Sequence, residues 1–138
     1  MIEDMIDLGR RAVACKYWRW MPGMLRHDGY RYVGSGVWVR WSETADLLSA
    51  LHIPDQFPDL SDPATLGCLL ALVRAAYRDT SKLWEGHVEV RRDHRILFFV
   101  VSFRHDASGA LVEDTLATGS TEAEALGCAL KAAAGTSP

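Results

Sequence analysis

Residues 96–103 read Ile-Leu-Phe-Phe-Val-Val-Ser-Phe, a run in which only the serine is polar. A short apolar run that is rich in β-branched and aromatic residues and bounded by turn signals favours a strand. Strands with nearly continuous apolar sequences are usually covered on both faces. We therefore expect residues 96–103 to form the central strand of a sheet that other elements cover.

Two flanking segments predict strands beside this run. Residues 87–91 alternate between apolar and polar side chains, and residues 110–118 follow the loop signal Asp-Ala-Ser-Gly at 106–109. Arg-Asp-His at 92–94 provides a turn between the first two strands. The order predicts an antiparallel arrangement, because short turns join strands that run in opposite directions.

Two more candidate strands lie in the first third of the chain. Residues 17–26 are rich in aromatic side chains, but Pro22-Gly23 interrupts them, which indicates an edge strand or a bulge. Residues 30–41 also alternate, and Gly34-Ser35-Gly36 divides them into two short strands with a turn.

Helices are predicted for residues 2–15, 42–51, 63–78 and 122–134. Asp62 before Pro63 is a strong start signal, with the aspartate as N-cap and the proline at the first helical position. Thr121 and Glu124 fit a capping box at the start of the last helix. Apart from the short helix at 42–51, the order is roughly helix, two or three strands, helix, two or three strands, helix. This order predicts the α+β class, an antiparallel sheet with helices packed on it.

The chain has 138 residues and a formal net charge of −3. This length fits one domain, which we expect over residues 1–134, with a flexible tail at 135–138. The charge is uneven, since residues 1–41 hold seven Lys and Arg against four Asp and Glu. A dedicated duplex-DNA-binding domain would be more basic.

The apolar pattern and the first residues of the chain predict an intracellular protein. No stretch approaches the roughly 20 apolar residues of a membrane-spanning helix, and the first residues are acidic where a secretory signal would be basic.

Cys15, Cys68 and Cys128 are widely spaced and form no Cys-x-x-Cys pair, so neither a zinc site nor a redox motif is predicted. Each cysteine lies among apolar helical residues, where we expect buried, unreactive thiols.

Three segments together carry a resemblance to a known group of proteins. They are Ala14-Cys-Lys-Tyr-Trp-Arg-Trp-Met-Pro-Gly-Met24, Leu60-Ser-Asp-Pro-Ala-Thr-Leu-Gly-Cys-Leu-Leu-Ala-Leu-Val-Arg74 and Thr121-Glu-Ala-Glu-Ala-Leu-Gly-Cys-Ala-Leu-Lys131. The set resembles small proteins of tailed bacteriophages and prophages, and it is similar to the phage ABA-sandwich family. The resemblance implies a phage context. It implies no reaction, and it assigns no catalytic residue.

The candidate binding residues are an aromatic and basic group in the first third of the chain, together with one later arginine. They are Trp18, Arg19, Trp20, Trp38, Arg40, Trp41 and Arg104. Arginine pairs with phosphate and carboxylate and stacks on rings, and indoles stack on bases or anchor protein interfaces. The alternative is structural: the tryptophans fill the core between sheet and helices, and the arginines are solvated.

A second basic group surrounds the hairpin at 88–105, and it consists of Arg91, Arg92, Arg95 and Arg104. As a patch it would bind phosphate. As a solvated strand edge it would discourage aggregation, which is the interpretation we favour.

Catalytic motifs are weak. The sequence has no His-Glu-x-x-His and no Gly-x-Ser-x-Gly motif. His94, His105 and Asp106 flank one hairpin and are the best candidates for acid–base chemistry near Arg104. Loop histidines at a surface are the commoner case.

We therefore expect a phage-encoded, non-enzymatic binding protein of the host cytoplasm, without cofactor or metal. It would interfere with a host defence process by occluding a host protein or by sequestering a nucleotide signal. Homo-oligomers are plausible, because a sheet with an open edge can pair by two-fold symmetry. The alternatives are a nucleic-acid-binding accessory domain and, ranked last, a small phosphodiesterase or nuclease.

Overall fold

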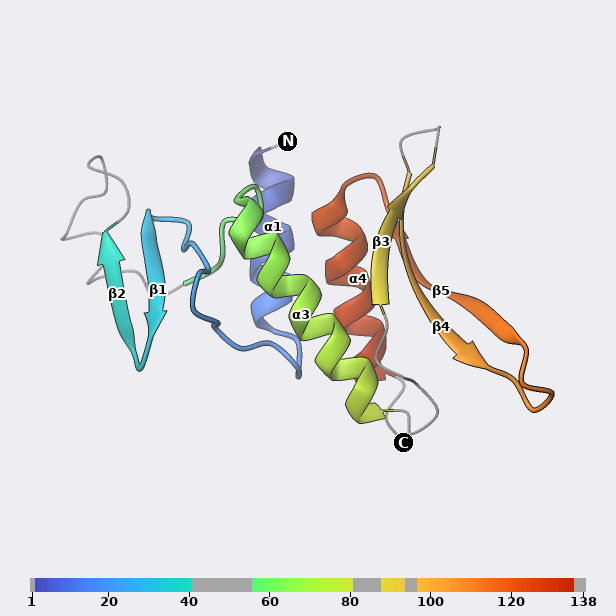
Figure 1. Ribbon diagram of the computed structural model, residues 1–138. Helices are drawn as coiled ribbons and strands as arrows, with labels where there is room; N and C mark the ends of the chain where they lie inside the picture. The colour runs from blue at the N-terminus through green and yellow to red at the C-terminus, as the bar shows by residue number, and fades with distance from the viewer. Residues whose placement is uncertain (1, 41–55, 81–87, 94–96, 136–138) are drawn as a thin grey trace. The chain divides into compact units, whose positions relative to one another are not determined.

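The chain is an α+β protein with two antiparallel sheets, as a computed structural model shows (Figure 1). The structure describes residues 2–40, 56–80, 88–93 and 97–135. Its elements are α1 (Ile2–Val13), β1 (Tyr30–Gly34), β2 (Val37–Arg40), α3 (Pro63–Thr80), β3 (Val88–Arg92), β4 (Phe98–His105), β5 (Leu111–Gly119) and α4 (Glu122–Gly135). The expected fold class is confirmed. The helix expected at 42–51 lies outside the described residues.

The contacts divide the chain into two compact units. The first unit comprises residues 1–14 and 18–68, and the second comprises residues 15–17 and 69–138. Helix α3 belongs to both, because its first turns lie in the first unit and the remainder in the second. The single domain expected from the chain length stays a prediction.

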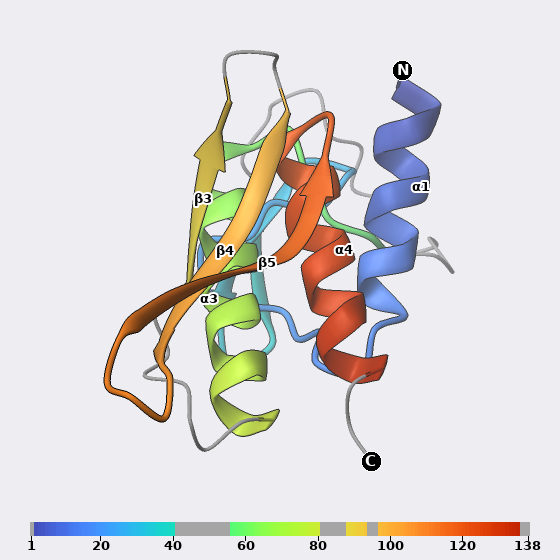
Figure 2. The same cartoon turned by 90° about the vertical axis from the view of Figure 1, so that its right-hand side faces the viewer.

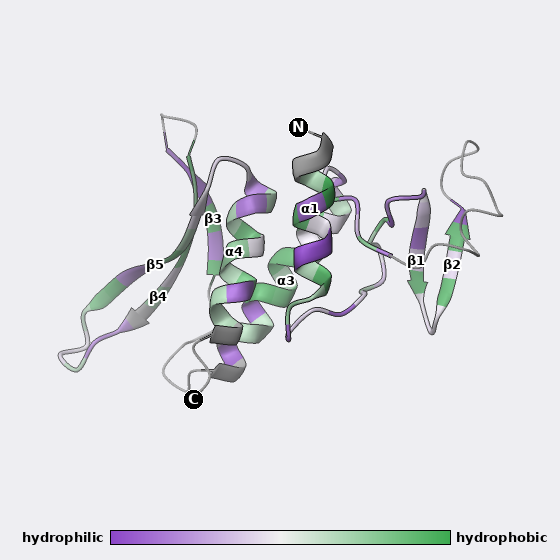
Figure 3. Cartoon of the chain, turned by 180° about the vertical axis from the view of Figure 1, so that it is seen from behind, coloured by the Kyte–Doolittle hydropathy of each residue, from purple (hydrophilic) through white to green (hydrophobic). Residues whose placement is uncertain are grey.

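In the first unit, α1 is amphipathic, and its hydrophilic and hydrophobic residues alternate along the helix in Figure 3. Leu8 and Ala12 are buried. Gly9 allows a close backbone approach, because a Cβ atom at this position would lie 2.9 Å from the carbonyl oxygen of Pro58. Helix α1 therefore packs directly on the segment that precedes α3.

Strands β1 and β2 form the expected hairpin, with Tyr32 opposite Trp38. The strand expected at 17–26 is wrong as a regular element. Only isolated bridges form there, although Gly23 N–H donates to the Tyr32 carbonyl at 2.8 Å. Pro22 has no N–H to donate, and Gly23 has a φ of 105°, so this segment turns alongside β1 and does not extend it.

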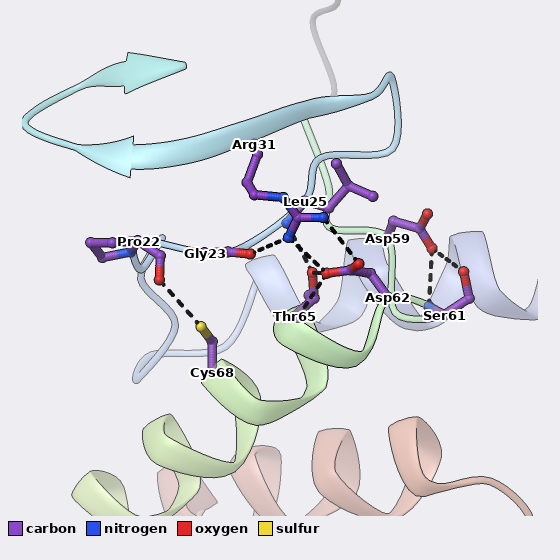
Figure 4. Close-up of polar contacts among 9 residues, drawn as sticks. All are labelled: Pro22, Gly23, Leu25, Arg31, Asp59, Ser61, Asp62, Thr65 and Cys68. Atoms are coloured by element: carbon purple, nitrogen blue, oxygen red, sulfur yellow. Dashed lines mark hydrogen bonds and ion pairs between the residues drawn. The ribbon is translucent and has the colours of Figure 1, made fainter. Parts of the chain in front are cut away.

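Helix α3 begins where the sequence predicts, and a polar network fixes its first turn (Figure 4). Asp62 accepts hydrogen bonds from the backbone N–H of Thr65 at 2.9 Å and from its hydroxyl at 2.8 Å. The same hydroxyl accepts the N–H of Leu25 at 2.8 Å. Arg31 donates to both carboxylate oxygens of Asp62, at 3.1 and 3.2 Å, and to the carbonyl of Gly23 at 2.6 Å. The N-cap prediction is confirmed, and the cap also ties the hairpin to the helix.

The pKa of Asp62 reflects this network. Burial alone would raise the pKa of this carboxyl, but hydrogen bonds from Arg31 and Thr65 and the positive charge of Arg31 hold it below its ordinary value. The carboxylate is thus the stable form in the folded protein.

The second unit contains the sheet β3-β4-β5, in which β4 is the central strand, as its apolar sequence predicts. Helices α3 and α4 cover one face of this sheet (Figure 2). Val100 and Val101 are both buried although successive strand residues point to opposite faces. Phe99 and Phe103 are half-buried, so burial on both faces is complete only in the middle of the strand.

Helix α4 begins after Gly119 and Ser120, and Thr121 caps it by accepting the N–H of Glu124 at 3.0 Å. The second half of the expected capping box is different, because the Glu124 carboxylate accepts the hydroxyl of Ser120 at 2.9 Å. The Tyr77 hydroxyl of α3 donates to the carbonyl of Ala129 on α4 at 3.0 Å, and burial raises the pKa of Tyr77.

The cysteine expectation needs one correction. Cys128 is exposed, and Cys15 and Cys68 are only half-buried. Burial raises the pKa of both half-buried thiols, although the charge of Lys131 opposes this at Cys15 and that of Arg31 opposes it at Cys68.

Among the helices that the structure describes, none combines the length and apolar character needed to span a bilayer.

Candidate functional site: the β1–β2 hairpin and its aromatic cluster

Four aromatic rings of the first unit form one continuous cluster. Trp18 and Trp20 meet edge to face with ring centroids 5.3 Å apart, and Trp20 meets Trp38 in the same way at 5.0 Å. Tyr32, opposite Trp38 in the hairpin, lies 4.9 Å from it in a tilted arrangement. Edge-to-face contacts are a favourable geometry for aromatic pairs, and they stabilise the pair beyond what the burial of apolar area contributes. We call Trp18, Trp20, Tyr32 and Trp38 the aromatic cluster.

A buried ion pair supports the cluster from the turn that precedes β1. Arg26, only 4% exposed, donates to both carboxylate oxygens of Asp28, at 2.6 and 2.7 Å. Its guanidinium also lies 4.7 Å from the Trp38 ring centroid and 5.1 Å from that of Tyr30. The planar fork of arginine suits both contacts, so this side chain joins the turn to the rings.

These pairs leave two arginines of the hairpin region uncompensated. Arg26 is neutralised by Asp28, and Arg31 by Asp62. Arg19 and Arg40 are exposed, and the structure places no acidic partner beside either of them within its described residues. Among the described residues, the solvent-facing charge next to the aromatic cluster is therefore positive.

The opposite face of the hairpin, which also carries the paired Arg31, has exposed apolar side chains. Val33 and Val37 are each 51% exposed and Val39 is 47% exposed, and alternation along the strands places all three on the face away from Tyr32 and Trp38. Single exposed apolar residues are common, but three on one short hairpin form a patch. We call Val33, Val37 and Val39 the valine face.

One polar group of the aromatic cluster has no hydrogen-bond partner among the described residues. The indole Nε1 of Trp18 is buried and has no acceptor among the described residues. Most buried donors in folded proteins are paired, and an unpaired one destabilises the fold by about 1–3 kcal/mol. The hydrogen bonding of Trp18 is therefore poorer than is usual for a buried indole.

The structure brings together three of the residues that the sequence singled out, Trp18, Trp20 and Trp38. All three are half-buried, so the cluster is neither a sealed core nor an open platform. Trp41 lies outside the described residues. Arg104 belongs to β4 of the second unit, where it lies opposite Val112, and it is not a member of the cluster.

Sequence reasoning missed Arg26, Asp28 and Tyr32 as members of the site. Asp28-Gly29 is a turn signal, but such a signal does not reveal that an arginine two residues earlier pairs with the Asp28 carboxylate. The alternation of Tyr30 and Tyr32 did place both tyrosines on one face, which was the available signal.

The residues considered for catalysis serve a local turn. Asp106 accepts hydrogen bonds through one oxygen from the N–H and hydroxyl of Ser108 and from the N–H of Ala110. His105 Nδ1 lies 3.3 Å from the Gly109 carbonyl of the same turn. His94 lies outside the described residues. Within the described chain, no group of three or more His, Cys, Asp or Glu side chains is placed to hold a metal ion.

The second basic group is partly engaged within its own sheet. Arg91 pairs with Glu89 at 2.7 Å and with Glu113, and its guanidinium lies 5.1 Å from the Phe103 ring centroid. Arg92 lies 5.6 Å from the Phe98 ring centroid. These contacts favour the solvated strand edge over a phosphate-binding patch.

Comparison of the sequence with models of known protein families, with curated proteins and with solved structures found no match in any of the three. The phage resemblance stays an expectation based on the three segments quoted above.

Proposed function

We propose that the chain is a non-enzymatic binding protein that occludes a protein surface through its β1–β2 hairpin. The observation that carries this proposal is the valine face, about half exposed on a hairpin whose other face is stiffened by packed rings. A rigid binding element loses less conformational entropy on association. The aromatic cluster thus supplies pre-organisation, and the valine face supplies contact area.

The charges favour a protein partner over a nucleotide. Two of the four arginines in the hairpin region are neutralised by aspartates. Trp18, Trp20 and Trp38 contact one another edge to face, so none of these described pairs forms a parallel slot for a base. Aliphatic valines bind apolar protein surface, not phosphate. By the same alternation along the strands Arg40 lies on the Trp38 side of the hairpin, so Arg19 and Arg40 favour a partner that reaches round the hairpin edge and places carboxylates beside the aromatic cluster.

The phage resemblance supplies the biological setting of this proposal. In that setting the partner is a protein of the bacterial host, and the complex forms in the host cytoplasm. Interference with a host defence protein is the role that a small binding protein without catalysis would fill.

The test is capture from host lysate with matched variants, at low and high salt. Val37→Thr combined with Val39→Thr removes apolar surface and retains β-branched side chains, so the hairpin should stay folded. Leu111→Thr is the control, because this residue is 64% exposed on β5 of the second unit. We expect one host protein to be retained by the wild type and by Leu111→Thr and lost from the double variant.

A second variant tests the charge. Arg40→Glu should weaken the captured complex about tenfold and reduce its salt dependence, whereas Arg92→Glu in the second unit should leave both unchanged. Equal retention by all variants would show non-specific adsorption and would contradict the proposal. Retention of a nucleotide or a single-stranded nucleic acid in place of a protein would favour the alternative instead.

A further inference from the structure

A cavity of about 480 Å³ lies within the first unit, apart from the aromatic cluster and the valine face. Its walls come from α1, from the segment that precedes α3, and from one histidine. Its lining includes Met5, Ile6, His27, Phe57, Asp59 and Ser61. Small-molecule sites typically have this size and combine mostly apolar walls with a few fixed polar groups.

The apolar wall is held rigidly. The His27 ring stacks on Phe57 with centroids 3.8 Å apart and an interplanar angle of 8°. The His27 N–H donates to the Phe57 carbonyl at 3.0 Å, and the Arg10 guanidinium lies 5.2 Å from the Phe57 ring centroid. Met5 and Ile6 of helix α1 also line the cavity, and α1 packs closely on Pro58 through Gly9. This wall therefore needs little rearrangement to receive a ligand.

The polar rim offers an acceptor, and the donors of Asp59 and Ser61 are used within the protein. Asp59 N–H donates to the Leu25 carbonyl at 2.8 Å, and Ser61 N–H donates to Asp59 Oδ1 at 3.0 Å. The Ser61 hydroxyl donates to the same oxygen (Figure 4). Asp59 Oδ2 has no hydrogen-bond partner among the described residues. One carboxylate oxygen with its negative charge is thus left for a ligand.

We propose that this cavity binds a small molecule with an apolar body and one cationic amine, the amine donating to Asp59 Oδ2. The apolar body lies between Met5 and Ile6 of α1 and the Phe57 side of the wall. An anionic ligand is disfavoured, because it would meet the Asp59 carboxylate and find the donors of Asp59 and Ser61 occupied.

The test uses three probes that differ only in the polar group: 2-phenylethylamine, 2-phenylethanol and 3-phenylpropionate. Titration of the full chain is followed by NMR on the Met5 and Ile6 methyl groups and the Ser61 amide. We expect saturable shifts at these residues, with the amine bound most tightly and the carboxylate most weakly. A preference for the carboxylate, or shifts confined to other residues, would overturn the proposal.

The matched variant is Asp59→Asn, which keeps an acceptor oxygen for Ser61 and replaces Oδ2 by a donor. It should weaken amine binding about tenfold or more and leave 2-phenylethanol nearly unchanged. Glu113→Gln on β5 removes the same charge and should change neither affinity. Ile6→Trp should fill the cavity and abolish binding of both probes. Equal amine affinity of Asp59→Asn and wild type would show that the carboxylate plays no part and would refute the proposed site.

Discussion

At the scale of single residues, a few charged side chains set how the first unit is joined together. Asp62 is the clearest case, since its carboxylate caps α3 and receives both arms of the Arg31 fork. The two side chains are only 13% and 15% exposed, so solvent screens their attraction less than at an open surface. Asp62 therefore holds α3 and β1 together.

We predict that Asp62→Ala lowers the free energy of unfolding by about 2–4 kcal/mol at neutral pH, because it removes both the cap and the partner of a largely buried arginine. Asp62→Asn keeps a capping oxygen and should lose less, about 1–2 kcal/mol. Chemical denaturation followed by circular dichroism measures both values. Equal stability of Asp62→Ala and wild type would contradict this role.

The same residue predicts a pH dependence of defined sign. Because the folded-state pKa of Asp62 lies below its unfolded value, its charge stabilises the protein fully above that unfolded value, about 3.9. The contribution falls as the pH drops below about 4 and through the folded pKa. The difference in stability between wild type and Asp62→Asn should therefore shrink in that acidic range, as parallel denaturation curves from pH 7 to pH 2 would show. A constant difference would exclude the ionised carboxylate as the cause.

At the scale of elements, the junction of β5 and α4 depends on a missing side chain. A Cβ atom at Gly119 would lie 2.6 Å from the backbone nitrogen of Ala125 and 3.0 Å from Glu124. Backbone atoms within a helix cannot move aside as a flexible side chain can. The helix therefore packs against the end of the strand only because residue 119 is glycine.

Gly119→Ala should destabilise the protein by about 1–3 kcal/mol, since the added methyl group pushes α4 away from β5. Gly127→Ala is the matched control on α4, where an added Cβ meets nothing within 4 Å. It should stabilise the protein by about 0.5–1 kcal/mol, because alanine is the better helix former. Thermal denaturation of the two variants should shift in opposite directions. A shift of both transition temperatures in the same direction would contradict the prediction for one of the two glycines.

At the scale of the whole molecule, α3 is the element that both compact units share. The two parts of this 18-residue helix, 63–68 and 69–80, are at or below the lower end of the roughly 12–15 residues that an isolated helix needs to be stable in water. Unfolding of one unit should therefore destabilise the other through α3, which Asp62 caps and whose first turn carries Thr65.

We predict that Gly119→Ala, although it lies in the second unit, reduces hydrogen-exchange protection in both units. Amides of β1, such as Tyr32, should lose protection together with amides of β4, such as Val100. Exchange measured by mass spectrometry on peptides from both regions provides the comparison. Reduced protection confined to β3, β4, β5 and α4 would show that the units open independently.

Local signals predicted most of the elements. The Asp62-Pro63 start, the Gly34-Ser35-Gly36 turn and the apolar run around Val100 each depend on neighbouring residues, and each is found where expected. The segment at 17–26 was predicted wrongly because its aromatic side chains resemble those of a strand. Its hydrogen bonds are decided by Pro22 and by the path of the neighbouring chain.

The sequence by itself determined the class of the fold, the caps of α3 and α4 and the central position of β4, because these follow from side-chain period and from bonds between residues a few positions apart. Only the tertiary structure decided that Trp20 meets Trp38, that Arg31 reaches Asp62, and that His27 stacks on Phe57 beside a cavity. These contacts join residues 18 to 31 positions apart, and their geometry depends on how the chain turns between them.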